Sequence, residues 1–499
     1  MDSEVIVVGA GPSGLALANV LIRQGVDVAV FDSKPGPTQE SRAMGVHART
    51  LEFYQQLGLA DEVVSRGIPA RDVEVFIDGK QKVEFSMSAL GEGISAFPYM
   101  LTFPQDEHER VLLKAFEDQG GKVHWNSPLL RFSQTSEHVT ATFAGDSSDG
   151  TFSGKYLVGC DGANSVVRKE LGIGFGGGTS DGLFFVADAQ IDVDHDNRIR
   201  ASLGDSTFGL MMPVRTTGTQ RLIGAVPAYM QTKEHFEFED VEPLLTKLLQ
   251  KKIKSVSWFS TYRVHHRVAD QFREGRVFIA GDAGHIHSPV GGQGMNTGIG
   301  DAINIGWKLS SVLKHGFSES LLDTYDPERR AFAKVLISTT DSAFQKITAP
   351  NSRLMSLFKW FLPLAIRRLT TNPLTRKRLF KTVSQVHIGY EDSALSSGKV
   401  GKHRAGQRLA WDPSGANYTP LEGMGWHVQV YGSASSEVLE WARTRGFPVH
   451  EIALNDSLKK RGFRSGNYYL IRPDGHIAVA VDAKGVTAAL KKFDEKFMK

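Results

Sequence analysis

The sequence contains very little cysteine, and this restricts the chemistry that the chain can carry. Cys160 is the single cysteine among 499 residues. An intrachain disulfide and a cysteine-rich zinc or iron-sulfur site are therefore excluded. One thiol suits a protein of the reducing cytosol. Demanding chemistry has to come from other side chains or from an organic cofactor.

Long apolar runs and an excess of one charge are missing as well. The chain starts with polar residues that lead directly into Val5–Val8, without the basic region and apolar stretch of a secretory signal. The 58 basic and 55 acidic residues nearly balance, at a net charge of +3, which does not indicate a nucleic-acid partner. We expect a cytoplasmic protein that does not span a membrane.

The most apolar later stretch, residues 354–369, leaves two interpretations open. A proline and three basic residues interrupt it, so a helix that spans a bilayer is not expected. An amphipathic helix there could touch an anionic membrane, because Arg376, Lys377 and Arg378 follow it. A helix that packs on the protein, or on the second subunit of a homodimer, is the more common case, and we favour it.

The order of the apolar runs predicts an α/β fold. Val5–Val8, a helix over 15–24 and Val28–Phe31 form a βαβ unit at the start. Short β-type runs then predict a second, inserted sheet, after which the first pattern returns. The expected architecture is a discontinuous Rossmann-like domain with a helical tail (1–180 and 265–390), an inserted β-sheet domain that binds substrate (181–264, with part of 70–105) and a C-terminal α/β domain (400–499).

A glycine-rich turn joins the first predicted strand to the first helix. Gly9, Gly11 and Gly14 have G-x-G-x-x-G spacing, and Asp32 ends the next strand. In this context the first glycine allows the sharp turn, the second lets the backbone approach a pyrophosphate, and the third lets helix and strand pack closely. The phosphates would lie at the helix N-terminus, beside Ser13, and Asp32 would bind a ribose. The turn predicts a bound dinucleotide without distinguishing FAD from NAD(P).

Two later segments have the character of cofactor-binding loops. Asp161 and Gly162 follow an apolar strand, where a hairpin turn is the alternative. Cys160 beside them is more typical of a small buried residue than of a nucleophile. Gly281 and Asp282 follow another strand and lead into a glycine-dense loop. Such a loop suits an acid on a ribityl hydroxyl and backbone amides against a flavin.

Together and in this order, the three segments resemble the flavin-dependent aromatic hydroxylases, the family that includes para-hydroxybenzoate hydroxylase, phenol hydroxylase and the polyketide hydroxylases. The resemblance covers residues 4–345, including Arg42 to Gly45 and Gln105. It implies FAD as cofactor, with NAD(P)H, which docks transiently, and molecular oxygen as co-substrates. The cofactor-binding residues that it implies are Gly9, Gly11, Ser13, Gly14, Asp32, Arg42, Gln105, Asp161, Arg168, Gly281, Asp282, Gly294, Met295 and Asn296.

The resemblance also implies individual roles. Asp32 and Arg42 would hold the adenosine ribose and the pyrophosphate, Gln105 would contact the ribityl region, and Asp282 would bind the ribityl chain and phosphate. Asp161 and Arg168 keep two open roles, one at the FAD pyrophosphate and one in NAD(P)H binding. The loop at Pro289, Gly291 and Gly292 would lie beside the flavin ring and stabilise negative charge on it through backbone amides.

The reaction implied by the resemblance is a monooxygenation. NAD(P)H reduces FAD, the reduced flavin forms a hydroperoxide with oxygen, and one oxygen atom passes to a phenolic, polyphenolic or polyketide-like ring. The protein would exclude water and orient the substrate. Apolar residues of the inserted sheet, Phe185, Met211 and Pro213, are the candidates for substrate contact, with core packing as the equal alternative.

Met44 departs from the family pattern, because phenol hydroxylase has an acid there that helps to activate the phenol. Deprotonation could fall to His47, His265, His285 or His287, although a lone histidine is more often structural. Solvent could also serve, or the substrate could be acidic by itself, as a polyphenol is.

The C-terminal module resembles the thioredoxin-like extension of the phenol hydroxylase branch. A polar run, residues 391–406, predicts a linker in front of it. The module contains no cysteine, which excludes thiol redox chemistry and favours a structural or dimer-related role.

Two other functions stay open at this point. The same scaffold serves an epoxidase, a Baeyer-Villiger-type oxygenase or a ring-oxidising enzyme, which product mass and oxygen-isotope incorporation would distinguish. A non-catalytic flavoprotein that recruits a partner would bind FAD without consuming NAD(P)H.

Overall fold

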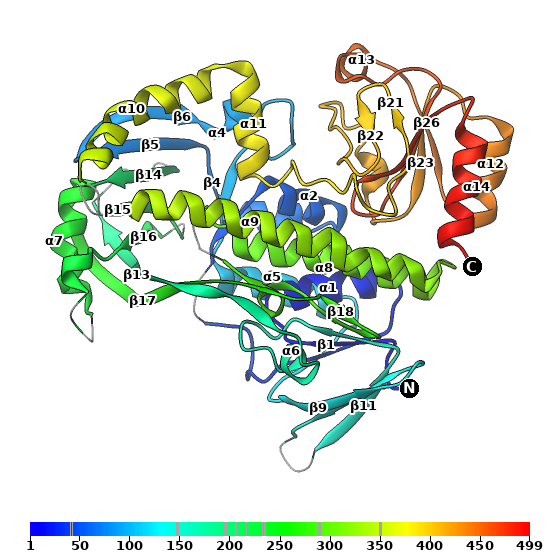
Figure 1. Ribbon diagram of the computed structural model, residues 1–499, viewed down its shortest axis with the longest axis horizontal. Coiled ribbons are helices and arrows are strands. Elements are labelled where there is room, and N and C mark those ends of the chain that lie inside the picture. Colours follow the sequence, from blue (N-terminus) through cyan, green and yellow to red (C-terminus); the bar gives the residue numbers. More distant parts are fainter. Residues whose placement is uncertain are drawn as a thin grey trace.

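The computed structural model covers the chain from residue 1 to residue 499 and describes all of it except residues 40, 42, 146–148, 193–196, 205–206, 216, 232, 234–235, 288–290 and 349–351. For residues 180–181, 228, 338–348 and 352–358 it describes the backbone alone. The described part is a mixed α/β protein, as the sequence predicts, and Figure 1 shows its helices and sheets.

The N-terminal part contains a six-stranded sheet. Its strands are Val5–Val8 (β1), Val28–Phe31 (β2), Val123–His124 (β8), Tyr156–Gly159 (β12), Arg273–Glu274 (β18) and Val277–Ile279 (β19). They lie in the order β18-β19-β12-β1-β2-β8, parallel except for the β18–β19 pair. Every residue of β1 is buried, as expected for a strand covered on both faces. The sheet is assembled from two distant parts of the sequence.

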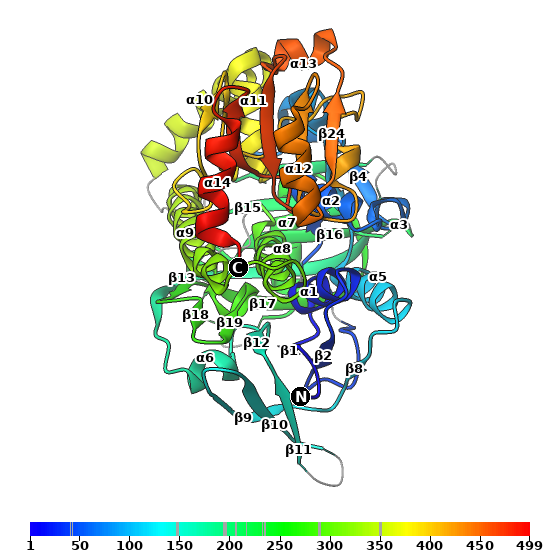
Figure 2. The ribbon, with the colours of Figure 1, turned by 90° about the vertical axis from the view of Figure 1, so that its right-hand side faces the viewer.

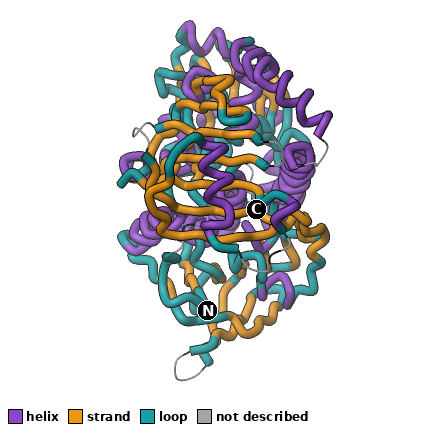
Figure 3. The backbone as a smooth tube through the Cα atoms, turned by 90° about the vertical axis from the view of Figure 1, so that its left-hand side faces the viewer, coloured by secondary structure: helices purple, strands orange, loops and turns teal. Residues whose placement is uncertain are grey.

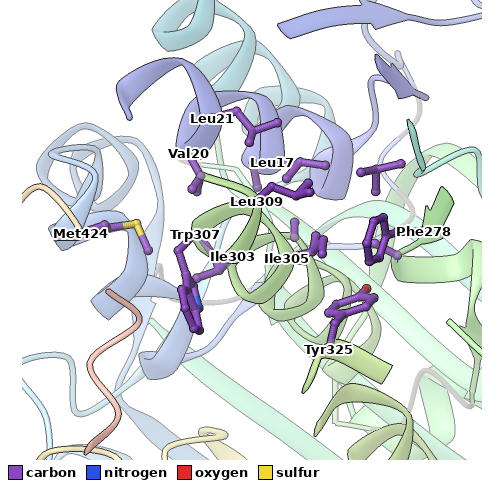
Figure 4. Packing of buried hydrophobic residues seen from close by; sticks show 14 of the residues in the cluster. Leu17, Val20, Leu21, Phe278, Ile303, Ile305, Trp307, Leu309, Tyr325 and Met424 are labelled. Atoms are coloured by element: carbon purple, nitrogen blue, oxygen red, sulfur yellow. The ribbon is translucent and has the colours of Figure 1, made fainter. Parts of the chain in front are cut away.

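Three helices cover this sheet, Pro12–Arg23 (α1), Gln105–Glu117 (α5) and Gln293–Lys314 (α8). Figure 2 shows them in a row above the sheet, with three further strands below it, Leu129–Gln134 (β9), Val139–Phe143 (β10) and Gly150–Gly154 (β11). Leu17, Val20 and Leu21 of α1 pack beside α8 (Figure 4). A Cβ at Gly306 would lie 2.9 Å from Val20 Cγ1, so glycine permits the close approach of the two helices.

An eight-stranded sheet forms the second layer. Its strands are Asp72–Ile77 (β5), Lys80–Ser86 (β6), Phe175–Ile191 (β13), Arg198–Leu203 (β14), Phe208–Pro213 (β15), Thr219–Ala225 (β16), Ile253–Ala269 (β17) and His285–Ile286 (β20). The order is β20-β17-β13-β16-β15-β14-β5-β6. Figure 3 shows the strands stacked across the middle of the molecule. The helix Phe238–Leu249 (α7) packs on one face of this sheet.

Shorter elements connect the two layers. Gly45–Val46 (β3), Met100–Thr102 (β7) and Ile68–Ala70 (β4) form a small antiparallel sheet in the order β3-β7-β4. The short helices are Ala48–Gln56 (α2), Ala60–Arg66 (α3), Met87–Gly91 (α4) and Val166–Glu170 (α6), and the 3-10 turns are Ala228–Met230 (η1), Gly281–Ala283 (η2), Glu319–Thr324 (η3) and Thr419–Leu421 (η4).

Three longer helices follow the second layer, Tyr325–Thr348 (α9), Ser352–Thr371 (α10) and Pro373–Val383 (α11). In Figure 1, α9 crosses the molecule beside α8, whereas α10 and α11 lie at the top, near β6. Within the described ranges, we find no helix that is both long enough and apolar enough to cross a bilayer.

The C-terminal part has a four-stranded sheet, ordered β24-β23-β25-β26. Its elements are His427–Tyr431 (β23), Ser436–Arg445 (α12), Val449–Ile452 (β24), Asp456–Arg461 (α13), Asn467–Ile471 (β25), Ile477–Asp482 (β26) and Val486–Phe497 (α14), preceded by Lys399–Val400 (β21) and His403–Arg404 (β22). Its core is continuous with that of the N-terminal part, because the rings of Trp307 and Trp426 lie 5.5 Å apart, edge to face.

The prediction of a linker at residues 391–406 is wrong. The N–H of Ser397 donates to the carbonyl oxygen of Ala478 at 2.9 Å, and Ser393 Oγ donates to Glu328 at 2.6 Å. These bonds hold the run against β26 and α9, so the segment joins the two parts as packed structure.

Candidate active site

The turn between β1 and α1 has the geometry that a pyrophosphate needs. Gly9 has a φ of +104°, and a Cβ there would lie 2.4 Å from the carbonyl oxygen of Cys160. A Cβ at Gly14 would lie 1.8 Å from the carbonyl oxygen of Gly9. At Gly11, by contrast, a Cβ would meet nothing within 4 Å, and no side chain caps the start of α1. Open space in front of an uncapped helix N-terminus fits the pyrophosphate of FAD.

Asp32 lies at the end of β2, against this turn, and is 7% exposed. Its Oδ2 accepts the N–H of Ala10 at 2.6 Å, and its Oδ1 accepts the N–H of Lys34 at 2.8 Å. The two bonds fix the carboxylate at the predicted ribose position and leave lone pairs for hydroxyl groups.

Gln105 begins α5 and holds the segment that precedes β3. Its Oε1 accepts the N–H of Ala43 at 3.2 Å, and its Nε2 donates to Glu109 at 3.0 Å. Glu109 in turn accepts the N–H of Thr38 at 2.8 Å. Gln105 therefore positions this segment, while its contact with a ribityl chain stays a prediction. Arg42 lies outside the described residues.

The segment after β12 continues into α6 and forms no hairpin. Asp161 Oδ2 accepts the N–H groups of Val166 and Val167 at 2.7 and 3.1 Å, whereas its buried Oδ1 has no partner in the described structure. Burial raises the pKa of Asp161. Arg168 donates to the carbonyl oxygens of Ala283 at 2.7 Å and Ala163 at 2.9 Å. Arg168 thus fastens this segment to the Gly281–Ala283 turn.

The Gly281–Ala283 turn rests on a buried ionic cluster that the sequence motifs did not reveal. Asp301 on α8 accepts the N–H of Gly281 at 3.0 Å, His285 Nε2 at 2.6 Å and Arg329 Nε at 2.6 Å. The Arg329 guanidinium and the hydrogen bond with His285 lower the pKa of Asp301 against the effect of burial. Asp301 lies inside a helix, away from any strand end, so no sequence signal distinguished it.

Asp282 projects from this turn and is exposed. Protein surrounds it closely enough that desolvation raises the pKa of its carboxyl. Gly281 has a φ of +63°, and a Cβ there would lie 2.7 Å from Ser13 Oγ. The turn therefore places Gly281, the residue before Asp282, against the start of α1, as a single cofactor that spans both loops would require. Ser13 packs between the loops.

The loop before α8 is held by Asn296 and His47. Gly291 and Gly292 have φ values of +79° and +62°, two successive left-handed residues that favour glycine. Asn296 Nδ2 donates to the carbonyl oxygens of Gly45 at 2.7 Å and Gly292 at 2.8 Å, and its Oδ1 accepts the N–H of His47 at 2.8 Å. All polar atoms of Asn296 are thus used to position backbone.

His47 also holds the loop before α8. Its Nε2 donates to the carbonyl oxygen of Gly291 at 2.8 Å, which places the proton on Nε2. Burial lowers the pKa of His47 to about 4, so it is neutral at neutral pH and a weak base. His285 is engaged with Asp301, and the exposed His265 lies 2.8 Å from Thr179 Oγ1.

The remaining predicted residues of this loop lie as follows. A Cβ at Gly294 would approach the His287 ring to 3.7 Å. Met295 is partly buried against the main core. Pro289 lies outside the described residues, so its predicted place beside the flavin ring stays a prediction.

The eight-stranded sheet places the predicted substrate residues on one face, the one that α7 covers. Phe185 and Met211 are fully buried in the cluster beneath α7. Strand alternation puts Met212 on the opposite face, where it packs with Met44 and Val214. For Phe185 and Met211 this placement agrees with the core-packing alternative. Pro213 ends β15 and is buried, on the same face as Met211, because its partner in the register is Gln220, which pairs with Ala189.

The second face also holds a buried ion pair that sequence reasoning missed. Arg221 is opposite Met212 in the β15–β16 register, and paired residues share a face. Its Nε and Nη2 donate to Asp188 at 2.7 and 2.8 Å. Arg221 is 0% exposed, and its Nη1 has no partner in the described structure.

Comparisons with known proteins agree with this geometry. Residues 2–340 match the family described as FAD binding domain. The sequence is 31% identical over 517 positions to 6-methylpretetramide 4-monooxygenase of Streptomyces rimosus, with 97% of this chain and 92% of that protein covered. It is 31% identical over 411 positions to rifampicin monooxygenase of Rhodococcus hoagii, with 78% and 79% covered.

A solved structure is also similar over its full length. Anhydrotetracycline hydroxylase from Streptomyces rimosus superposes with a TM-score of 0.78 at 27% identity, covering 100% of this chain and 99% of that one. The family match covers more than half of the chain, and the first of these relatives is covered almost completely. The chain belongs to the FAD-binding-domain family of flavin-dependent aromatic hydroxylases and is an FAD-dependent monooxygenase.

Proposed function

We propose that this enzyme hydroxylates a large, polycyclic phenol rather than a simple one. The observation that carries the proposal is the apolar wall around Met44. Met44, Met212 and Val214 are each less than 10% exposed and pack with Met100, Leu210 and Ile223. A methionine wall adapts its shape to a wide apolar ring system. It supplies no acid at the position before Gly45, so the substrate has to be acidic by itself.

FAD supplies the redox chemistry when bound, taking electrons from NAD(P)H and activating oxygen. The chain's own residues bind, orient and exclude water. Asp32 and the Gly11 turn would hold the adenosine half, Asp282 would hold the ribityl chain, and the Gly291–Gly292 loop would present backbone N–H groups to the flavin ring. Asn296 and His47 keep that loop in place.

Arg221 is the proposed polar contact of the substrate. A buried guanidinium with one unused N–H group suits an oxygen of the ligand. Arg221→Lys would keep the charge that faces Asp188 but could not present the same planar donors. We expect the KM for the best substrate to rise about tenfold, with an unchanged FAD content.

The domain assignments, the location and the oligomeric state are also part of this proposal. We assign substrate binding to the inserted sheet, residues 181–264 with part of 70–105, and a thioredoxin-like fold without cysteines to residues 400–499. A cytoplasmic location and a homodimer without a nucleic-acid partner follow from the composition and from the family resemblance.

The test is the rate of NADPH and NADH oxidation by the FAD-loaded enzyme with simple phenols and with polycyclic phenols. Polycyclic phenols should raise the rate at least about tenfold above the ligand-free rate, and simple phenols less. Stimulation by simple phenols alone would refute the proposed substrate class. No stimulation by either group, with FAD bound, would favour a non-catalytic flavoprotein.

A further inference from the structure

The helical segment α10–α11 lies in a stretch without acidic residues. Between Asp341 and Glu391 the sequence has nine Lys or Arg residues and no Asp or Glu. The whole chain has 58 basic and 55 acidic residues. The rest of the chain therefore has 49 basic against 55 acidic residues and a net charge of −6. The positive charge of this protein is concentrated in one segment.

The same segment exposes large apolar side chains. In the described part of the chain, five of the eleven exposed large hydrophobic residues lie between 360 and 374. They are Trp360 at 73%, Phe361 at 52%, Leu364 at 66%, Leu369 at 43% and Leu374 at 82% exposed. Trp360 and Leu364 are one helical turn apart and share a face of α10. Such a concentration marks an interaction surface.

Exposed basic residues lie among these apolar side chains. They are Arg367, Arg368, Lys377, Arg378 and Lys381, and with the five apolar residues they make up the α10–α11 surface. Lys359, which is buried, forms an ion pair with Asp78 at 2.6 Å and fastens α10 beside β6. Figure 1 shows α10 along the upper edge of the molecule, with α11 beside it. The surface therefore faces outward.

We propose that the α10–α11 surface docks this enzyme on an anionic lipid membrane. Tryptophan, phenylalanine and leucine on one side of a helix insert into the headgroup boundary, while arginine and lysine attract anionic lipids and extend their charges to the headgroups. The helix lies in the plane of the interface and does not span the bilayer. This attachment goes beyond the oxidation chemistry and does not depend on the substrate.

The positive charge of the α10–α11 surface favours an anionic membrane over a second copy of the chain as its binding partner. A two-fold symmetric contact through the α10–α11 surface would place two basic surfaces without acidic partners against each other, and like charges across an interface repel. An anionic lipid headgroup supplies the missing negative charge. The exposed Trp360 and Leu364 then find an apolar environment as well.

The experiment is co-sedimentation of the FAD-loaded full chain with vesicles at low ionic strength. Vesicles of equal parts phosphatidylglycerol and phosphatidylcholine should bind the wild type, and pure phosphatidylcholine vesicles should bind it much less. Each basic residue near an anionic surface contributes roughly a fivefold change in partitioning. We therefore expect R367Q/R368Q to bind about 25-fold more weakly, and W360S/F361S at least about tenfold more weakly.

The matched control is L439S/R443Q on α12, which also changes an exposed leucine, 46% exposed, and an exposed arginine. It should bind within about twofold of the wild type. FAD content and circular dichroism verify that each variant is folded. Failure of the wild type to bind anionic vesicles, or binding that W360S/F361S leaves unchanged, overturns the proposal. A dimer that W360S/F361S converts to a monomer, without vesicle binding, would identify a subunit interface instead.

Discussion

Asn296 Nδ2 donates to the carbonyl oxygen of Gly45 at 2.7 Å and so connects residues that are 251 positions apart in the chain. The same side chain holds Gly292 and His47. One amide on α8 therefore sets the distance between the segment after Met44 and the glycine loop. In the proposed function this loop lies beside the flavin ring, which would make Asn296 a positioning residue.

Substitutions at two glycines of the first turn should affect cofactor binding and protein stability differently. Gly11→Val adds a side chain to open space at a φ of −79°, so the apoprotein should keep its Tm, but FAD affinity should fall at least about tenfold because the side chain fills the pyrophosphate space. FAD titration and thermal unfolding check this. Gly14→Ala is the contrasting variant, since its Cβ would lie 1.8 Å from Gly9 O. Equal losses of Tm in both variants would contradict the assignment.

Asp301→Asn should destabilise the enzyme strongly. It leaves the buried Arg329 and His285 without their carboxylate partner, and breaking a buried pair costs about 3–5 kcal/mol. Urea unfolding measures the loss. Asp323→Asn is the control, because Asp323 is 73% exposed and pairs with Arg273 at the surface. This variant should cost less than about 1 kcal/mol. A similar cost for both variants would contradict the role of Asp301 at the centre of the buried ionic cluster.

His47 should make the enzyme less stable in acid. Burial lowers its pKa from 6.5 to about 4, so between these values the unfolded chain binds the proton and the folded protein does not. The contribution of neutral His47 is complete above pH 6.5 and is lost as the pH falls from 6.5 to 4. His47→Gln, which can still donate to Gly291, should weaken this pH dependence by up to about 3 kcal/mol.

Urea unfolding of the wild type and His47→Gln between pH 4 and 7 measures this difference. The pKa values of the buried His108 and His427 are also lowered by burial, to about 3 and about 4. They act with the same sign in both proteins, so the difference isolates His47. Identical pH profiles would show that His47 is not buried as described.

Arg472 should join the C-terminal sheet to the rest of the enzyme. It is fully buried, and its guanidinium donates to Glu328 on α9 at 2.9 and 3.0 Å and to Asp474 at 2.7 Å. Arg472→Met should cost about 3–5 kcal/mol within one cooperative transition, because the two parts share a core. The exposed Arg464→Met should change stability by less than about 0.5 kcal/mol. Separate unfolding of residues 400–499 would contradict this coupling.

The sequence revealed the residues proposed to bind the cofactor better than the residues that hold them in place. Gly9, Gly11, Gly14 and Asp32 form a local motif between a strand and a helix, and the described turn has the geometry that the motif predicts. Asp301 could not be found, because its partners come from a turn 20 residues earlier and from α9, 28 residues later. Long-range ion pairs leave no spacing signal.

The faces of the eight-stranded sheet were also only partly predictable. Alternation shows that neighbouring residues of a strand face opposite sides, but it does not show which side α7 covers. Phe185 and Met211 lie on the side that α7 covers, whereas Met212 packs with Met44 on the other side, and their contact with substrate stays a prediction. The polar composition of residues 391–406 similarly predicted a linker where the structure has a packed segment. The partners of this segment lie in β26 and α9, which are distant in the sequence.

The most direct test of monooxygenation is the mass of the product formed under ¹⁸O₂ with the phenol that stimulates NAD(P)H oxidation most. We expect a product that has gained one oxygen atom, labelled from the gas, in amounts that follow NAD(P)H consumption. A product without added oxygen, or peroxide as the only product of oxygen, would contradict the assignment of this enzyme as an aromatic hydroxylase.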